Sequence, residues 1–165
     1  MIRQGEKIKT GFLIGRFQPF HKGHLRLIKK SLEYVDKLII GIGSIGIVDP
    51  DNFLDYEIRK KMLKLVVEKE RWQDKIKKIV PLRDFNDDVL WLRHSLDMAG
   101  KFDVVIGNNE WTNGIFERAG HQVLRLGFYK RYLYEGVKIR RLMSVGGAWE
   151  ERVPEYILNL IINSK

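Results

Sequence analysis

Short apolar runs alternate with amphipathic stretches along most of the chain. Five short runs rich in apolar residues predict buried strands, at residues 11–15, 37–43, 76–81, 103–107 and 122–126. Between them, apolar residues recur at helical spacing and predict helices over 23–35, 55–70, 87–98 and 111–119. Two more helices are expected after the last strand, over 136–144 and from Pro154, a favourable first helical residue, to about 163.

The predicted strands are nearly continuous in apolar residues, which is typical of strands buried on both faces. Such strands form a parallel sheet that is covered by helices on each side. The sequence therefore predicts one α/β domain over residues 1–165, a doubly wound, Rossmann-like, five-stranded parallel sheet with C-terminal helices. In the helix at 87–98, Val89, Leu92 and Leu96 are expected to face the core. Ligands of such folds bind at the carboxyl ends of the strands, so residues that follow strands are the candidates for chemistry.

Composition narrows the class of protein. The absence of cysteine excludes disulfides, thiolate nucleophiles and cysteine-ligated zinc. No apolar run approaches the ~18 residues of a membrane span, and the basic first ten residues lack the apolar segment of a secretory signal. We expect a cytoplasmic protein without a membrane partner.

The charge balance leaves three interpretations open. Lys and Arg number 30 and Asp and Glu 21, which gives a formal net charge of +9. A basic domain is typical of nucleic-acid binders, but an enzyme that handles phosphorylated small molecules also needs cationic groups. A charged residue content of 31% without cysteine also suits the exterior of a thermophile protein.

One segment carries the candidate chemistry, Gly15-Arg16-Phe17-Gln18-Pro19-Phe20-His21-Lys22-Gly23-His24, which follows the first strand and opens the first helix. Gly15 lets a ligand approach the backbone closely. Peptide N–H groups at the helix N-terminus attract an anion, and His21 and His24 can donate hydrogen bonds to phosphate oxygens. The arrangement suits a triphosphate. A zinc site is disfavoured because no third ligand cluster with zinc spacing accompanies the two histidines.

The run from Gly15 to His24 resembles the signature of the nucleotidylyltransferase superfamily, most closely that of the archaeal nicotinamide mononucleotide (NMN) adenylyltransferase family. The resemblance covers nearly the whole chain and includes Gly41-Ile42-Gly43-Ser44, Trp91, Gly136-x-x-Ile139-Arg140-Arg141-x-Met143 and Trp149-Glu150-x-x-Val153-Pro154. It implies transfer of AMP from ATP to NMN with Mg²⁺, giving NAD and pyrophosphate, in a homo-oligomer. Because a phosphate nucleophile is already ionised at neutral pH, such catalysis needs positioning and charge stabilisation rather than a general base.

The resemblance also implies roles for individual residues. The catalytic residues would be His21, His24 and Arg140, which contact the ATP phosphates. Further ATP contacts would come from Gly15, Arg16, Phe17, Gly23, Gly107, Asn108, Asn109, Gly136 and Arg141. NMN would be bound by Ser44, Asp84, Asp88 and Trp91. The indole of Trp91 would stack on the cationic nicotinamide, although core packing is the alternative, because Leu90, Trp91 and Leu92 are contiguous.

Three departures from the family pattern keep other functions open. Glu135 and Val137 replace hydroxyl residues expected on the triphosphate, Asp88 replaces an Asn, and the segment after Ser44 lacks small and hydroxyl residues. The alternatives are an adenylyltransferase for another phosphate acceptor, such as FMN or phosphopantetheine, or a non-catalytic nucleotide-binding relative.

A nucleic-acid partner is not expected. The chain has no Lys-Met-Ser-Lys-Ser run, and no predicted strand alternates aromatic and basic residues as an RNA-stacking sheet does. The cluster Tyr129-Lys130-Arg131-Tyr132 precedes the Gly136 motif, where substrate contact is the better explanation. Part of the positive charge is then assigned to a nucleotide pocket and the rest to solvated surface.

Overall fold

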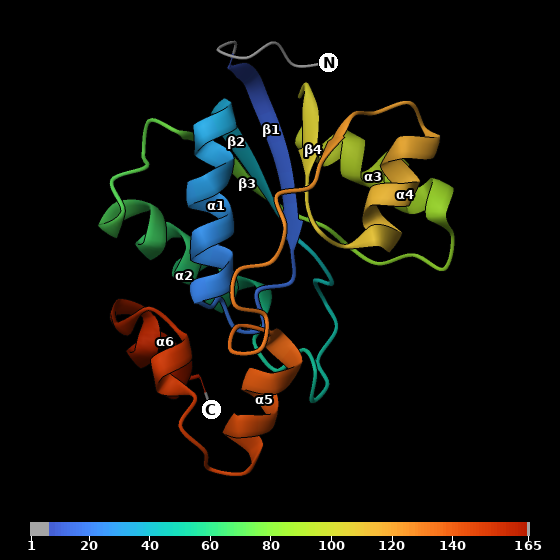
Figure 1. Ribbon diagram of the computed structural model, residues 1–165. Coiled ribbons are helices and arrows are strands. Elements are labelled where there is room, and N and C mark those ends of the chain that lie inside the picture. The colour runs from blue at the N-terminus through green and yellow to red at the C-terminus, as the bar shows by residue number, and fades with distance from the viewer. Residues whose placement is uncertain (1–6, 165) are drawn as a thin grey trace.

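The computed structural model describes residues 7–164, which are built around a five-stranded parallel sheet (Figure 1). The strands are β1 (Ile8–Gly15), β2 (Val35–Ile42), β3 (Ile76–Pro81), β4 (Val104–Ile106) and β5 (Val123–Leu124). The helices are α1 (Lys22–Tyr34), α2 (Tyr56–Lys69), α3 (Asp88–Ala99), α4 (Glu110–Arg118), α5 (Gly136–Ser144) and α6 (Leu158–Ile162). Two 3₁₀ turns, Glu150–Arg152 and Glu155–Ile157, precede α6.

The strand order β3-β2-β1-β4-β5 confirms the predicted doubly wound, Rossmann-like fold. The chain extends the sheet from β1 through β2 to β3, and then crosses to the other side of β1 to add β4 and β5. The order therefore reverses between β1 and β4. Loops that leave the strand ends at this switch point diverge, which opens a crevice for a ligand.

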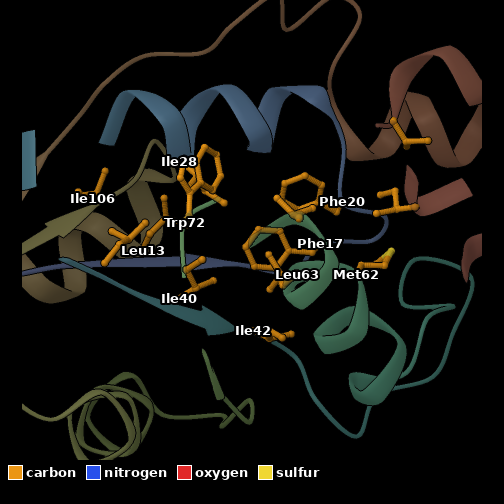
Figure 2. Packing of buried hydrophobic residues seen from close by; sticks show 14 of the residues in the cluster. Leu13, Phe17, Phe20, Ile28, Ile40, Ile42, Met62, Leu63, Trp72 and Ile106 are labelled. Atoms are coloured by element: carbon orange, nitrogen blue, oxygen red, sulfur yellow. The ribbon is translucent and has the colours of Figure 1, made fainter. Parts of the chain in front are cut away.

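Side chains from alternate positions of the central strands form two hydrophobic cores, one on each face of the sheet. Leu13 and Ile40 pack with α1 and α2 (Figure 2). Their neighbours Phe12 and Ile39 point to the opposite face, where α3 and α4 cover them. Because successive side chains of a strand point to opposite faces, an unbroken apolar run supplies both cores at once.

Three local predictions are corrected by the structure. Val89 is 64% exposed, and α3 instead buries Trp91, Ser95 and Ala99. The fifth strand shrinks to two residues, because only Val123 and Leu124 pair with β4. The segment from Pro154 begins as a 3₁₀ turn and becomes α-helical at Leu158. No helix within residues 7–164 is long and apolar enough to cross a membrane.

Candidate active site

A cavity of about 790 Å³ lies where the strands end at the switch point. Loops after all five strands, α1 and the first turn of α4 contribute to its lining. Eleven of the residues expected from sequence line it: Gly15, Arg16, His21, Gly23, His24, Ser44, Asp84, Trp91, Asn108, Asn109 and Gly136. Residues that follow different strands, although far apart in the sequence, thus lie together in one cavity.

The two histidines form the N-terminal cap of α1. His21 is the N-cap, and its Nδ1 accepts hydrogen bonds from the backbone N–H groups of Gly23 (3.1 Å) and His24 (3.3 Å). In return, the His21 backbone N–H donates to Nδ1 of His24 at 3.2 Å. The imidazoles stack with their centroids 3.6 Å apart. This is a capping box made from two histidines, and it fixes both rings at the mouth of the helix.

Both imidazoles are held neutral by their surroundings. Burial, reinforced by the nearby Arg140 guanidinium, lowers the pKa of His21 from 6.5 to about 3. Burial and the adjacent His21 ring lower the pKa of His24 as well. Because each Nδ1 accepts a backbone N–H, the single proton of each neutral ring resides on Nε2. The site therefore has two neutral imidazoles, each with an Nε2–H that can donate a hydrogen bond to an anionic oxygen.

Arg140 lies next to this pair although it is not part of the cavity lining. Its side chain is nearly buried and donates to the backbone oxygen of Gln18 (3.1 Å) and to Oδ1 of Asp51 (3.2 Å). A Cβ on Gly136 would stand 2.8 Å from Nη1 of Arg140. Gly136 therefore leaves the space that the guanidinium occupies, which explains a glycine at the start of α5.

A buried arginine, whose role sequence reasoning missed, holds the loops that follow β1 and β2. The Arg59 side chain is fully buried, and its Nη1 donates to the backbone oxygens of Arg16 (2.8 Å) and Gly43 (2.7 Å). Phe17 and Ser44, the residues that follow these two, have positive φ angles of 54° and 52°. Such backbone is costly for residues other than glycine, so it persists only where surrounding contacts hold it. The available signal was the position of Arg59 on the apolar face of a predicted helix.

The two asparagines after β4 use their amides within the protein. Asn108 donates through Nδ2 to the Gly127 oxygen (2.8 Å) and accepts from the Gly127 N–H (2.9 Å), as a neighbouring strand would. Asn109 caps α4 by accepting from the backbone N–H groups of Trp111 and Thr112. Asn108 thus uses both ends of its amide and Asn109 uses its Oδ1, and both residues lie in the cavity lining.

Four other predicted residues lie outside the cavity lining, as Arg140 does. Phe17 is fully buried, and its ring fills the space where Gly15 would carry a Cβ. Gly107 lies at the end of β4, where its carbonyl accepts from the Asn113 amide. Asp88 is exposed on α3 and pairs with Arg118 at 3.6 Å, and Arg141 is exposed on α5.

Aromatic residues supply much of the wall that sequence reasoning did not assign. Phe85 follows β3, Trp111 lies in the first turn of α4, and Phe128 follows β5. The same signal that pointed to Asn108, a position after a strand, applies to Phe85 and Trp111. Tyr129 and Arg131 belong to the aromatic and basic cluster for which substrate contact was expected, and both line the cavity.

A parallel sheet of order 3-2-1-4-5 with a histidine-capped helix at its switch point defines a nucleotide-binding α/β protein. Residues 12–141 match the cytidylyltransferase-like family. The nicotinamide-nucleotide adenylyltransferase of Thermoplasma acidophilum is 39% identical over 162 residues, which cover 96% of this chain and 88% of that protein. That of Archaeoglobus fulgidus is 37% identical over 154 residues, covering 91% and 88%.

A solved structure points the same way. The bifunctional NMN adenylyltransferase/ADP ribose pyrophosphatase from Francisella tularensis superposes with a TM-score of 0.76 at 25% identity, over 88% of this chain and 45% of that one. The chain belongs to the cytidylyltransferase-like family and, within it, to the group formed by the archaeal nicotinamide-nucleotide adenylyltransferases. The expected family, fold and enzyme class are confirmed.

Proposed function

We propose that this protein transfers the adenylyl group of ATP to the 5′-phosphate of NMN, giving NAD and pyrophosphate. The observation that carries the proposal is the His21–His24 cap of α1 at the strand-switch cavity, in a chain whose archaeal relatives are nicotinamide-nucleotide adenylyltransferases. The cavity of about 790 Å³ has room for a dinucleotide-sized ligand.

In the proposed reaction, an oxygen of the NMN phosphate attacks the α-phosphorus of ATP, and the bond to the β-phosphate oxygen breaks as pyrophosphate leaves. The attacking oxygen is already ionised, so the protein has no proton to remove. The Nε2–H donors of His21 and His24 stabilise charge that grows on the phosphate oxygens, assisted by the N-terminus of α1. Arg140, held by Asp51 and Gln18, adds a fixed positive charge beside them.

Glu135, which stands just before α5 where the family pattern has a hydroxyl residue, is compatible with ATP binding. Glu135 would repel a triphosphate if its charge were uncompensated. Its carboxylate oxygens instead lie 3.4 Å from Arg131 Nη2 and 3.2 Å from Lys138 Nζ. The two cations leave this edge of the cavity with a net positive charge, so Glu135 does not favour the non-catalytic alternative by itself.

We propose that Mg²⁺ enters with ATP, as part of the substrate. Magnesium commonly keeps several waters and is held mainly by substrate phosphates with one or two carboxylates. Within residues 7–164 no group of three or more His, Cys, Asp or Glu side chains is placed to hold a metal ion. Asp84 and Glu135 are the carboxylates that line the cavity.

The proposal includes the expected setting of the enzyme, namely a cytoplasmic homo-oligomer with no nucleic-acid or membrane partner. Light scattering on the purified protein tests the oligomeric state, and a mass close to 19.4 kDa would contradict it. A salt-sensitive shift of RNA at micromolar protein would contradict the exclusion of nucleic acid.

The deciding experiment is an assay of the purified protein with ATP, Mg²⁺ and NMN, in which NAD and pyrophosphate should form in equal amounts. His21→Ala should lower kcat by about 10²- to 10³-fold, the usual cost of one donor to a developing charge. His121→Ala, which removes a histidine outside the cavity, is the matched control and should keep its activity. FMN and phosphopantetheine in place of NMN test the alternative acceptors, and ATP binding without turnover on any acceptor would identify a non-catalytic relative.

A further inference from the structure

A histidine of α3 binds the loop that follows β3. This loop runs from Leu82 to Asp87 and joins β3 to α3. At one end the Leu82 N–H donates to the Ile42 carbonyl at 2.8 Å, and at the other end Asp87 caps α3. Between these ends the Arg83 N–H donates to Nε2 of His94 at 3.1 Å. His94 is half-buried and lies outside the cavity lining, so it acts on the loop from outside the cavity.

The two residues that follow Arg83 line the cavity. They are Asp84 and Phe85, a carboxylate and an aromatic ring. The Phe85 ring also packs against the His94 imidazole, with centroids 5.3 Å apart, and the Arg83 guanidinium carbon lies 5.2 Å from the centroid of the Phe85 ring. Because a peptide unit is planar, fixing the Arg83 N–H restricts where the adjoining residues can lie. His94 therefore contributes to the position of both cavity residues.

His94 can hold the loop only as a neutral ring. Since Nε2 accepts the Arg83 N–H, the single ring proton resides on Nδ1. Burial, reinforced by the Arg83 guanidinium, lowers the pKa of His94, and the Asp97 carboxylate acts in the opposite direction. The ring is therefore neutral at pH 7. Charged groups of the elements packed against α3 have other partners: Lys78 of β3 donates to the Met98 carbonyl, and Arg118 of α4 pairs with Asp88.

The loop belongs to the part of the cavity that suits the acceptor. The cap of α1, assigned to the triphosphate, follows the central strand β1, whereas the loop follows β3 at one edge of the sheet. The negative charge of Asp84 disfavours a phosphate, but its oxygens can accept hydrogen bonds from sugar hydroxyls. A loop that is fixed before the acceptor arrives loses little freedom when the acceptor binds.

We propose that His94 is a positioning residue for the acceptor, which fixes the loop carrying Asp84 and Phe85 by accepting the Arg83 N–H. The inference rests on the proposed function, because the acceptor is NMN. His94 does not touch the substrate in this account. It lowers the cost of binding NMN, because the loop is already in place.

The test compares variants with and without an acceptor at position 94. His94→Leu and His94→Ala have none, whereas the side-chain oxygen of His94→Gln can replace Nε2. Arg93→Leu, at an exposed neighbouring position of α3, is the matched control. Circular dichroism confirms that each variant is folded. The KM for NMN, the KM for ATP and kcat are then measured at pH 7.5 with Mg²⁺.

We expect His94→Leu and His94→Ala to raise the KM for NMN by about 3- to 10-fold, the range of one hydrogen bond. The KM for ATP and kcat should stay within about twofold, because the triphosphate site is held by other contacts. His94→Gln should restore the KM for NMN to within about twofold of the wild type, and Arg93→Leu should not change it.

Acid provides a readout that a packing role would not change. A protonated imidazole cannot accept the Arg83 N–H, whereas a Gln oxygen accepts at any pH. The KM for NMN of the wild type, divided by that of His94→Gln, should be near one at pH 7.5 and rise to about 3 or more at pH 5. The NMN phosphate and His21 titrate in both measurements, so their effects cancel in this ratio.

Three results would overturn the inference alone. They are an unchanged KM for NMN in both His94→Leu and His94→Ala, an equal rise in the KM values for NMN and ATP, and a ratio that does not change with pH. The second would indicate a general structural role. In each case the wild type would still make NAD, so the proposed function would stand. If the wild type makes no NAD from NMN, the proposed function fails, and the inference fails with it.

Discussion

Replacing His21 by Asn should make the protein less sensitive to acid. Asn is among the best N-cap residues, and its side-chain oxygen can accept the N–H bonds that His21 Nδ1 accepts now. At neutral pH we therefore expect the free energy of unfolding to change by no more than about 1 kcal/mol. The difference between the two proteins should appear below pH 6.5, because Asn cannot take up a proton.

The magnitude follows from linkage. The pKa of His21 is lowered from 6.5 to about 3 in the folded protein, so between these values the unfolded chain binds the extra proton and the folded one does not. The contribution of neutral His21 to the free energy of unfolding is fully present above pH 6.5 and is lost as the pH falls towards 3. At pH 4.5, two units below the unfolded value, the wild type should have lost about 2.7 kcal/mol more than His21→Asn, at about 1.36 kcal/mol per unit.

The assay is urea unfolding followed by circular dichroism at pH 7 and pH 4.5. The carboxylates are present in both proteins, so the difference between the two pH dependences reports His21 together with the effect of its ring on the pKa of His24, which has the same sign. If wild type and His21→Asn lose the same stability within about 0.5 kcal/mol, His21 is not held neutral by burial, and the account of the cap as two neutral donors is refuted.

Three further predictions concern the supports of the cavity. Gly136→Ala should lower kcat by about 10-fold or more with a smaller change in melting temperature, because the new Cβ, 2.8 Å from Nη1, displaces Arg140; an unchanged kcat would contradict this. Asn108→Ala should lower the free energy of unfolding in urea by about 1–3 kcal/mol, since it removes both bonds to Gly127, and a neutral effect would show that these bonds are dispensable. Arg59→Met should destabilise by about 3 kcal/mol or more in the same assay, as carbonyls at two strand ends lose their donor; Lys61→Met, at an exposed position on the same helix, is the control and should change stability by less than about 0.5 kcal/mol.

Local pattern in the sequence was sufficient for the elements and their layering. Unbroken apolar runs such as residues 37–43 indicate burial on both faces, and amphipathic spacing indicates helices that cover them. This reasoning depends only on neighbours in the chain, so the five strands, the parallel sheet and the His21–His24 turn were all predictable. It was wrong for Val89, because helical spacing alone does not fix which apolar residue of a helix meets the sheet.

The tertiary structure alone decided which residues share the cavity and what each side chain does there. Asn108 and Asn109 follow a strand, as binding residues do, yet their amides close the wall through Gly127 and the start of α4. Arg59 donates hydrogen bonds to backbone carbonyls 15 to 43 residues away in the sequence. Of the two tryptophans that line the cavity, Trp111 is exposed and Trp91 is buried. The motif in the sequence determined the chemistry at the mouth of α1, because a helix cap is built from residues three apart. Burial, ion pairing and which of the two tryptophans is exposed in the cavity depend on contacts between distant segments. Only the folded chain defines those contacts.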